Sequence, residues 1–309
     1  MFLDIFFSLY HVSRIDPSLI KIGLHISHEQ SQQAYIDASL GLFLSEWYNS
    51  SRPFVVYIHG FMQNDKHDSA VNIISALTKL DYNVFSVDWG YMAFESGGTA
   101  GLGLPFYNDA EQNSRIVGMC LAEIINAAAH YGKITFGQVS CVGFSLGAQV
   151  CAHFARNLNA KPSVIIGLDP PNLFFSIDTA YTERLTSDLA DIVHIVHTDR
   201  GFTGTDLDDG HANFYINNGV RNQPGCDTFF GIDLVCSHIR VCSYFVEAIL
   251  FPQNSVAVRC NSYDHFKMRQ CQRKFHYFGF PVDSKAKGKL YFNTNSAPPY
   301  LKGIQGAYP

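Results

Sequence analysis

Residues 139–158, VSCVGFSLGAQVCAHFARNL, decide the fold of this chain. An apolar run of strand length at residues 139–142 leads into GFSLG at 143–147, and a helix-like stretch follows to Leu158. A serine between two glycines fits a sharp strand-to-helix turn, because small neighbours let the strand and the helix approach closely. Such a turn raises the hydroxyl of Ser145 above the sheet edge at a helix N-terminus, where backbone N–H groups favour negative charge. The pattern predicts a nucleophilic serine.

The same alternation of strand-like and helix-like stretches continues on both sides of this segment. The strand-like runs are rich in Val and Ile and mostly do not alternate with polar residues, which is typical of strands buried on both faces. The chain therefore predicts an α/β fold with a central, mostly parallel sheet and helices on both faces. Further strands are expected at 54–58, 82–87, 164–168 and 192–196, and helices at 69–80, 110–131, 146–158 and 241–250.

Length and composition fit this expectation. The 309 residues are 47% apolar and 16% charged, and no Pro-, Gly- or Ser-rich linker divides them, so we expect one domain over 1–309. A net charge of −5 argues against nucleic acid as a partner. No apolar run approaches the roughly 20 residues of a membrane span. Residues 5–10 are predicted to be the first strand rather than an export signal, and the basic run 285–289 a solvated turn.

A serine hydroxyl is a poor nucleophile without a base, so the site must contain an oriented histidine. In this fold class the order along the chain is Ser, then Asp or Glu, then His. Asp169 follows the expected strand 164–168 at its carboxyl end, where ligand chemistry occurs in open α/β sheets. The alternative for Asp169 is an ordinary turn aspartate ahead of two prolines. His238, just before the expected helix 241–250, is the best-placed histidine. Its competitors are His194, His197 and His211, of which the first two are expected in the core.

Acyl transfer also needs N–H donors aimed at the developing oxyanion. The backbone N–H of Leu146, directly after the nucleophile, is one candidate. The second is the N–H of Phe61, in the His-Gly-Phe sequence that follows the expected strand 54–58. An ordinary turn at the end of a strand is the alternative for this second segment.

Eight cysteines divide into two groups. Cys226 with Cys236, and Cys260 with Cys271, each bracket a short loop, and no cysteine has the spacing of a zinc site. Two short-loop disulfides formed in an oxidising compartment are favoured over an all-reduced protein. The other four lie in apolar runs, where a free cysteine behaves as a small hydrophobic residue; their pairing stays open. They are Cys120, Cys141, Cys151 and Cys242.

Taken in order, the motifs of the chain resemble those of the pancreatic-lipase family, from about residue 5 to residue 303. The resemblance implies an α/β-hydrolase catalytic domain and places a catalytic triad on Ser145, Asp169 and His238. The matching segments are YIHGF at 57–61, VDW at 87–89, VGFSLGA at 142–148, GLDP at 167–170, VHTD at 196–199, GHANFY at 210–215, QPGC at 223–226, CSH at 236–238 and YFNTN at 291–295.

The chain departs from the family's pattern at several points. The C-terminal β-sandwich domain of the vertebrate lipases is not expected here, and with it a colipase-type protein cofactor. Phe144 and Gln149 stand where the family often has histidine, but neither is a triad position. Thr186 replaces an aspartate of the family's calcium site, so no metal near Asp188 and no other cofactor is expected.

The loop between Cys226 and Cys236 resembles the family's lid and holds only nine residues, 227–235. The loop 200–209 is also short and polar. Short versions of both resemble the phospholipase A1 members of the family, including secreted insect ones. A nine-residue lid leaves the site open to a charged headgroup, and its apolar side chains could enter a lipid surface; the alternative is that they pack the loop down. The apolar lid residues are Phe229, Phe230, Ile232, Leu234 and Val235.

These features predict a secreted carboxylic-ester hydrolase that acts on lipids at a lipid–water interface, through peripheral contact with a membrane or lipid surface. The favoured reaction is cleavage of the sn-1 acyl ester of phospholipids, a phospholipase A1 activity. A triglyceride lipase and a general carboxylesterase are alternatives within the same chemistry. A non-catalytic lipid-binding or yolk-type protein is the alternative of another class, and the filled triad positions argue against it.

Overall fold

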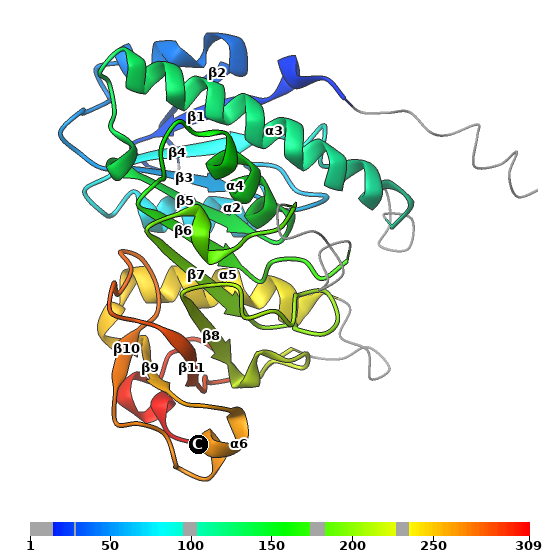
Figure 1. The fold of residues 1–309 in the computed structure, drawn as a ribbon, viewed down its shortest axis with the longest axis vertical. Helices are drawn as coiled ribbons and strands as arrows, with labels where there is room; N and C mark the ends of the chain where they lie inside the picture. The colour runs from blue at the N-terminus through cyan, green and yellow to red at the C-terminus, as the bar shows by residue number, and fades with distance from the viewer. Residues whose placement is uncertain (1–14, 28, 95–103, 174–182, 227–234) are drawn as a thin grey trace, which may run out of the picture.

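The computed structural model describes the chain except residues 1–14, 28, 95–103, 174–182 and 227–234 (Figure 1). Its described strands form one 11-stranded sheet in the order β10-β9-β11-β8-β7-β6-β5-β3-β4-β1-β2. All of these strands belong to that one sheet, so the described residues contain no β-sandwich domain. The predicted α/β-hydrolase fold is confirmed.

The middle of the sheet is parallel and its two ends are antiparallel. Parallel pairing joins β4-β3-β5-β6-β7-β8-β11, while β1 and β2 at one end and β9 and β10 at the other pair antiparallel. The strands are β1 (Lys21–His25), β2 (Ser31–Tyr35), β3 (Phe54–Ile58), β4 (Asn83–Asp88), β5 (Val139–Phe144), β6 (Val164–Leu168), β7 (Ile192–His197), β8 (Ala212–Ile216), β9 (Val256–Arg259), β10 (Phe275–Tyr277) and β11 (Gly288–Phe292).

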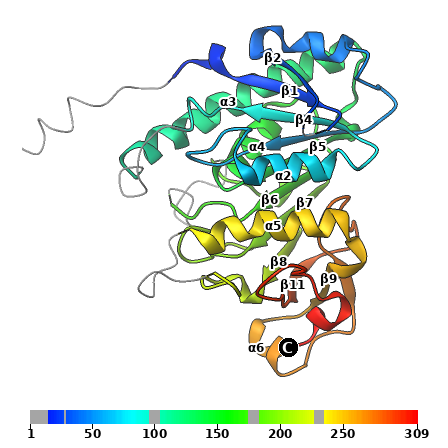
Figure 2. The same cartoon turned by 180° about the vertical axis from the view of Figure 1, so that it is seen from behind.

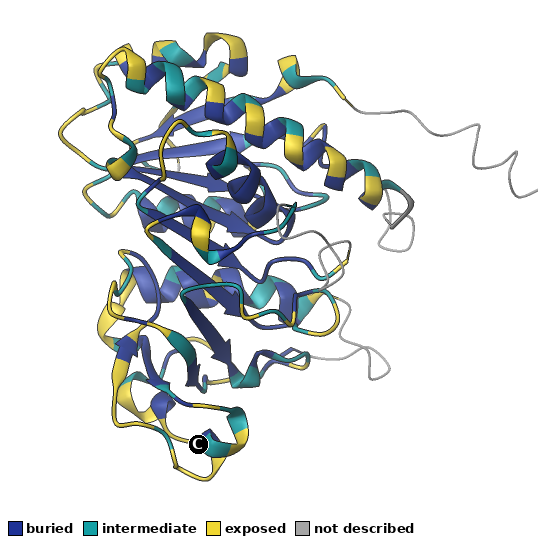
Figure 3. Ribbon diagram, viewed as in Figure 1, coloured by how far each residue is buried: buried dark blue, intermediate teal, exposed yellow. Residues whose placement is uncertain are grey.

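Helices cover both faces of the sheet, as Figures 1 and 2 show from opposite sides. On one face α3 (Leu104–His130) and α4 (Leu146–Asn157) pack together, and on the other α2 (Asp68–Leu77) lies beside α5 (Cys236–Leu250). The strands between them are dark blue in Figure 3 because both of their faces are buried. The short elements are α6 (Tyr263–Lys267) and the 3-10 helices η1 (Pro17–Leu19), η2 (Ile36–Leu44), η3 (Phe136–Gln138), η5 (Ser187–Leu189), η6 (Asn217–Gly219), η7 (Pro252–Asn254) and η8 (Gly303–Ala307).

The side chains of strand β3 pack into the hydrophobic cores on both faces of the sheet. Its five residues are all buried. Val56 and Ile58 pack in the core beneath α3 and α4, whereas Val55 and Tyr57 pack in the core beneath α2 and α5. Successive side chains of a strand point to opposite faces, so a strand covered on both sides needs an unbroken apolar run.

The strands and helices predicted from apolar runs are present, with shifted ends. The strands at 54–58 and 164–168 match β3 and β6, while the helix predicted from residue 110 begins at Leu104 as α3. Two expectations were wrong. The helix predicted from residue 241 already begins at Cys236, and Lys289 lies in β11 rather than in a solvated turn. The strand expected at residues 5–10 lies outside the described residues.

Six described strands were not predicted, among them the two at the ends of the sheet, β2 and β10. Strand β2 reads SQQAY and alternates between exposed and half-buried residues at the edge of the sheet. Strand β10 has only three residues, and its outer two side chains are exposed. Edge strands need to bury one face at most, so their sequences carry a weaker signal.

Three disulfides cross-link the described residues. The two predicted bonds, Cys226–Cys236 and Cys260–Cys271, are confirmed. Cys141 and Cys151, whose pairing the sequence left open, form a third bond, with Cα atoms 6.0 Å apart. The reason is the sharp turn between β5 and α4, which folds the helix back along the strand and brings the two cysteines side by side. Cys120 and Cys242 are free.

None of the described helices combines the length and the apolar character that a bilayer span would require.

Candidate active site

Ser145 lies in a strained turn between β5 and α4. Its backbone has φ 53° and ψ −124°, values that L-residues rarely adopt outside functional sites. The turn is fixed on both sides, since the Ser145 N–H donates to the Leu168 carbonyl at 2.9 Å and the Ser145 carbonyl accepts from Ala148 at 2.9 Å. The side chain of Ser145 is largely buried at the N-terminus of α4. The predicted strand–turn–helix arrangement is therefore present.

The flanking glycines allow the backbone segments of this turn to touch. A Cβ atom on Gly143 would lie 2.3 Å from the Gly147 carbonyl oxygen. A Cβ atom on Gly147 would lie 2.3 Å from the carbonyl oxygen of Ile58, at the end of β3. Both distances are far below van der Waals contact, so only glycine fits at either position without movement of the backbone.

The loop after β3 lies directly against the nucleophile. A Cβ atom on Gly60 would lie 3.0 Å from the Ser145 Cβ. His59 anchors this loop, because its Nε2 accepts from the Trp89 backbone N–H at 3.2 Å and its carbonyl accepts from the Trp89 indole at 3.0 Å. The next turn is tied down by a 2.7 Å bond from the Met62 N–H to the Ala93 carbonyl.

The two predicted oxyanion donors flank this contact. Phe61 follows Gly60 in the loop, and Leu146 is the first residue of α4. Neither backbone N–H donates to another residue in the described part of the chain. Both donors are thus available to a ligand oxygen beside Ser145.

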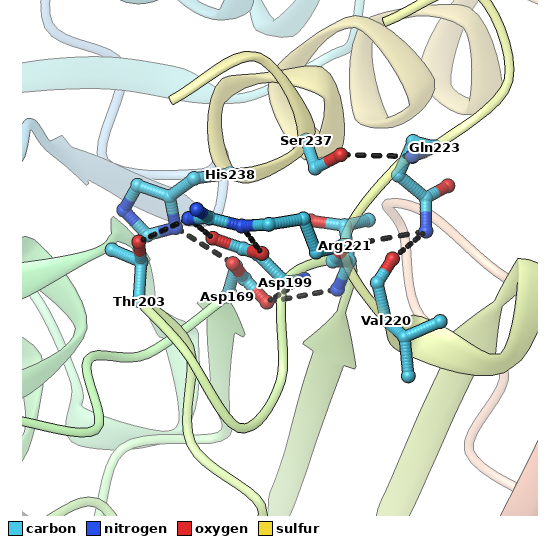
Figure 4. Close-up of polar contacts among 9 residues, drawn as sticks. Asp169, Asp199, Thr203, Val220, Arg221, Gln223, Ser237 and His238 are labelled. Atoms are coloured by element: carbon cyan, nitrogen blue, oxygen red, sulfur yellow. Dashed lines mark hydrogen bonds and ion pairs between the residues drawn. The ribbon is translucent and has the colours of Figure 1, made fainter. Parts of the chain in front are cut away.

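Asp169 lies at the end of β6 with a fully buried side chain and a positive φ of 47°. Each of its carboxylate oxygens has protein partners (Figure 4). Oδ1 accepts from the backbone N–H groups of Thr198, at 2.8 Å, and of Asp199, at 3.2 Å. Oδ2 lies 2.6 Å from Nδ1 of His238. The structure therefore brings together two of the three predicted triad residues, which are 69 positions apart.

His238 lies in the first turn of α5, not before the helix as its sequence had indicated. The helix begins at Cys236, where the disulfide to Cys226 fixes its start. The imidazole packs on the ring of Phe144, with centroids 4.9 Å apart, so it is held between Asp169 and the residue that precedes Ser145. Because Nδ1 faces Asp169, Nε2 is the nitrogen left for proton transfer.

The competing histidines have structural surroundings. His194 and His197 are buried in β7, as expected, and burial lowers the pKa of His194 to about 4. His197 has its Nδ1 3.1 Å from the Thr205 carbonyl oxygen, and burial lowers its pKa as well. His211 accepts a 3.0 Å hydrogen bond from the Val193 N–H, and burial lowers its pKa too.

Four residues around Asp169 were not identified as functional from the sequence. Thr198 and Asp199 supply the two N–H donors, and Asp199 forms a buried ion pair with Arg221. Gly204 lies so close that a Cβ atom there would be 2.5 Å from Asp169 Oδ1. The VHTD motif contained the first two, but nothing in the sequence pointed to Gly204 or Arg221.

The predicted lid falls largely outside the described residues, including Phe229, Phe230, Ile232 and Leu234. Its two ends are described: Cys226 and Cys236 are bonded with Cα atoms 5.6 Å apart. Arg240, four residues after Cys236, donates to the Gly225 carbonyl at 3.0 Å and so also ties the two ends of the loop together. Val235, at the end of the loop, is half exposed.

The position of the family's calcium site does not fit a metal ion. Thr186 donates to Asp188 at 2.6 Å, and Arg184 pairs with Asp209 at 2.7 Å, so protein groups already engage these carboxylates. Within the described ranges, no group of three His, Cys, Asp or Glu side chains could hold a metal. Gln149, at the other position that differs from the family, accepts from the Leu185 N–H at 2.8 Å.

Comparison with known proteins adds independent information. The family model described as Lipase matches residues 21–300. A phospholipase A1 of Vespula vulgaris is 36% identical over 204 residues, which cover 64% of this chain and 59% of that protein. Lipoprotein lipase of Mus musculus is 31% identical over 281 residues, 82% of this chain and 56% of that protein. The chain thus spans little more than half the length of these relatives.

A solved structure of a putative α/β hydrolase of Xanthomonas campestris is 19% identical in sequence. The match covers 47% of this chain and 71% of that chain with a TM-score of 0.33, which is too low to support an argument.

Proposed function

The chain belongs to the lipase family, and on that basis we propose that it hydrolyses carboxylic esters of lipids with Ser145, Asp169 and His238 as its catalytic triad. The single observation that carries the proposal is the 2.6 Å contact between His238 Nδ1 and the buried carboxylate of Asp169. That contact is made next to a serine turn whose backbone geometry is otherwise costly.

Hydrolysis proceeds in two steps. His238 Nε2 takes the proton of the Ser145 hydroxyl as the oxygen attacks the ester carbonyl, and Asp169 holds the imidazole and stabilises its charged form. The imidazolium then protonates the leaving alcohol, which departs and leaves an acyl-enzyme. Water attacks that ester with the same base and releases the fatty acid.

The backbone N–H groups of Phe61 and Leu146 bind the oxyanion in each tetrahedral intermediate. This role fits their place on either side of the Gly60–Ser145 contact. A donor of this kind contributes a factor of about 10²–10³ to kcat. No step requires a metal ion or an organic cofactor.

We propose a phospholipase A1 activity, cleavage of the sn-1 acyl ester of phospholipids. Two observations support this choice over triglyceride hydrolysis. The wasp relative at 36% identity is a phospholipase A1, and the lid loop is limited to nine residues by the Cys226–Cys236 bond. So short a loop cannot cover a deep acyl groove and leaves room for a charged headgroup. The similarity to lipoprotein lipase makes triglyceride hydrolysis the second candidate.

The three disulfides favour an oxidising compartment, and we infer a secreted enzyme that binds peripherally at a lipid–water interface. The phenylalanines of the lid loop, Phe229 and Phe230, are candidates for contact with that interface.

The triad is tested with Ser145→Ala. We expect kcat on a soluble ester to fall by about 10⁶ while the thermal unfolding transition is retained, and labelling by a serine-directed phosphonate to disappear. Ser163→Ala is the matched control, because Ser163 bonds to the Val139 carbonyl at the opposite end of β5. Esterase activity retained in Ser145→Ala would refute the assignment, and a wild-type protein inert to the phosphonate would favour a non-catalytic lipid-binding protein.

The substrate class is tested by assaying phosphatidylcholine vesicles beside a triglyceride emulsion. We expect release of the sn-1 fatty acid from the vesicles and little from the emulsion. Turnover of triglyceride alone would contradict the phospholipase A1 proposal, and equal rates on soluble and interfacial esters would indicate a general carboxylesterase.

A further inference from the structure

A second buried carboxylate lies next to the acid of the proposed triad. The Asp199 side chain has no exposure to solvent, and its own N–H donates to Asp169 Oδ1. Its charge is met by Arg221 in a two-point contact, Nε to Oδ1 at 2.9 Å and Nη2 to Oδ2 at 2.8 Å (Figure 4). This paired geometry is specific to arginine.

Arg221 also ties down the turn that covers Asp169. Its Nη2 donates to the Thr203 hydroxyl at 3.3 Å, and the exposed ring of Phe202 lies 3.3 Å from the guanidinium carbon. In the same turn the Gly204 N–H donates to the Asp199 carbonyl at 3.0 Å, and Gly204 packs on the Asp169 carboxylate. Arg221 therefore connects Asp199, whose N–H donates to Asp169, with the turn at Thr203 that packs over the same carboxylate.

We propose that Arg221 is a positioning residue for the Asp169–His238 pair. By holding Asp199 it keeps the N–H groups of Thr198 and Asp199 aimed at Asp169, and it balances the charge of a second carboxylate near the imidazole. This inference rests on the proposed triad. A buried ion pair is a weak source of stability in itself, so its location beside the acid is what gives it a role.

The charges around Asp169 make the effect of Arg221 measurable. Two other titratable groups in the described part of the chain face Asp169: His197, whose pKa is lowered by burial, and the Cys242 thiol, whose pKa is raised by burial. Both are neutral near pH 7. Asp169, Asp199 and Arg221 then sum to one negative charge. Without Arg221 the sum becomes two negative charges, which favours the protonated, inactive imidazole of His238.

The test compares kcat, KM and pH profiles of Arg221 variants on a short-chain p-nitrophenyl ester in solution. For Arg221→Met we expect kcat to fall about 100-fold, as for a small misplacement of a catalytic group, with KM nearly unchanged. The acid limb of the pH–rate profile should move up by about one pH unit, because one uncompensated charge remains. In Arg221→Met/Asp199→Asn the limb should return to its original position while kcat stays low.

Arg221→Lys keeps the charge and loses the two-point contact, so we expect an unchanged acid limb and a loss of kcat of about tenfold. This variant decides the question if Arg221→Met does not fold. The matched control is Arg184→Met, which removes another largely buried arginine–aspartate pair, Arg184–Asp209 at 2.7 Å. It should lower the unfolding temperature without changing the pH profile.

Wild-type kcat and acid limb in the folded Arg221 variants would overturn the inference, and so would an equal loss of kcat in Arg184→Met. Failure of the proposed function has a different signature: Ser145→Ala would then keep its activity, whatever Arg221 does.

Discussion

The turns that carry Ser145 and Asp169 are neighbours built in different ways. They follow the adjacent parallel strands β5 and β6, and each holds a non-glycine residue at positive φ, 53° for Ser145 and 47° for Asp169. The serine turn is held by its own glycines, whose missing side chains let β5, α4 and the end of β3 meet. The acid turn is held by donors 29 and 30 residues away, from Thr198 and Asp199.

The two turns therefore differ in how their positive φ is stabilised: the serine turn mainly by the glycines within it, and the acid turn by residues distant in the sequence. The serine turn requires glycine at residues 143 and 147, where a Cβ atom would meet backbone atoms, so substitutions there should disturb the packing of strand and helix. The acid turn depends on a loop that reaches it from β7, so substitutions there should disturb catalysis more than folding. The predictions below test this contrast.

The largest effect is expected for Asp169→Asn. An amide in this position fits the space and can still accept from the Thr198 N–H, but it cannot hold the imidazole in the required tautomer or balance its charge. We expect kcat to fall by about 10⁴, with a thermal unfolding temperature close to that of the wild type. The measurement is kcat on a soluble ester. A loss below tenfold would show that Asp169 is a turn residue and would remove the contrast.

The sequence was most informative where the structure is local. The GFSLG segment predicted the serine turn because the nucleophile and both of its glycines lie within five consecutive residues. The apolar runs predicted β3, β5 and β6 because a strand buried on both faces has little choice of side chain. The order of the triad residues, together with the family resemblance, then gave Asp169 and His238.

The remainder was hidden because it depends on tertiary contacts. Arg221 looks like any loop arginine until the fold places it on Asp199. The Cys141–Cys151 bond follows from the angle between a strand and a helix, which apolar runs do not encode. The start of α5 at Cys236 is likewise set by a disulfide to a preceding loop rather than by periodicity.

An intermediate effect is expected from adding one methyl group to each turn. In Gly147→Ala the Cβ would lie 2.3 Å from a backbone oxygen of Ile58, so we expect a loss of about 3 kcal/mol or more in the free energy of unfolding. In Gly204→Ala the Cβ would meet the Asp169 carboxylate at 2.5 Å, a side-chain group rather than backbone. There we expect kcat to fall about 100-fold with a smaller loss of stability.

Urea unfolding and kcat measured on the same preparations separate these outcomes. Gly137→Ala is the control, because a Cβ there would meet nothing within 4 Å. If Gly204→Ala loses as much stability as Gly147→Ala, the acid turn is part of the packing core, and the contrast between the two turns fails.

The smallest effect is expected for the loss of folding stability in acid, to which one buried histidine on the serine side and one on the Asp169 side should both contribute. His153 on α4 and His194 on β7 are buried, and burial lowers their pKa values to about 3 and about 4 from an ordinary 6.5. Well above pH 6.5 both are neutral whether the protein is folded or not, so they cost no stability. As the pH falls through 6.5 the unfolded chain binds protons that the folded chain cannot, so stability is lost down to about pH 4 for His194 and about pH 3 for His153. Each histidine contributes at most about 1.4 kcal/mol per pH unit to that slope.

His153→Leu and His194→Leu should each flatten the slope of unfolding free energy between pH 6.5 and 4.5 by a similar amount. If neither variant changes the slope of unfolding free energy against pH, burial of these histidines is not the cause of the acid sensitivity. If only His194→Leu changes it, the acid sensitivity comes from the side of the molecule that holds Asp169 alone.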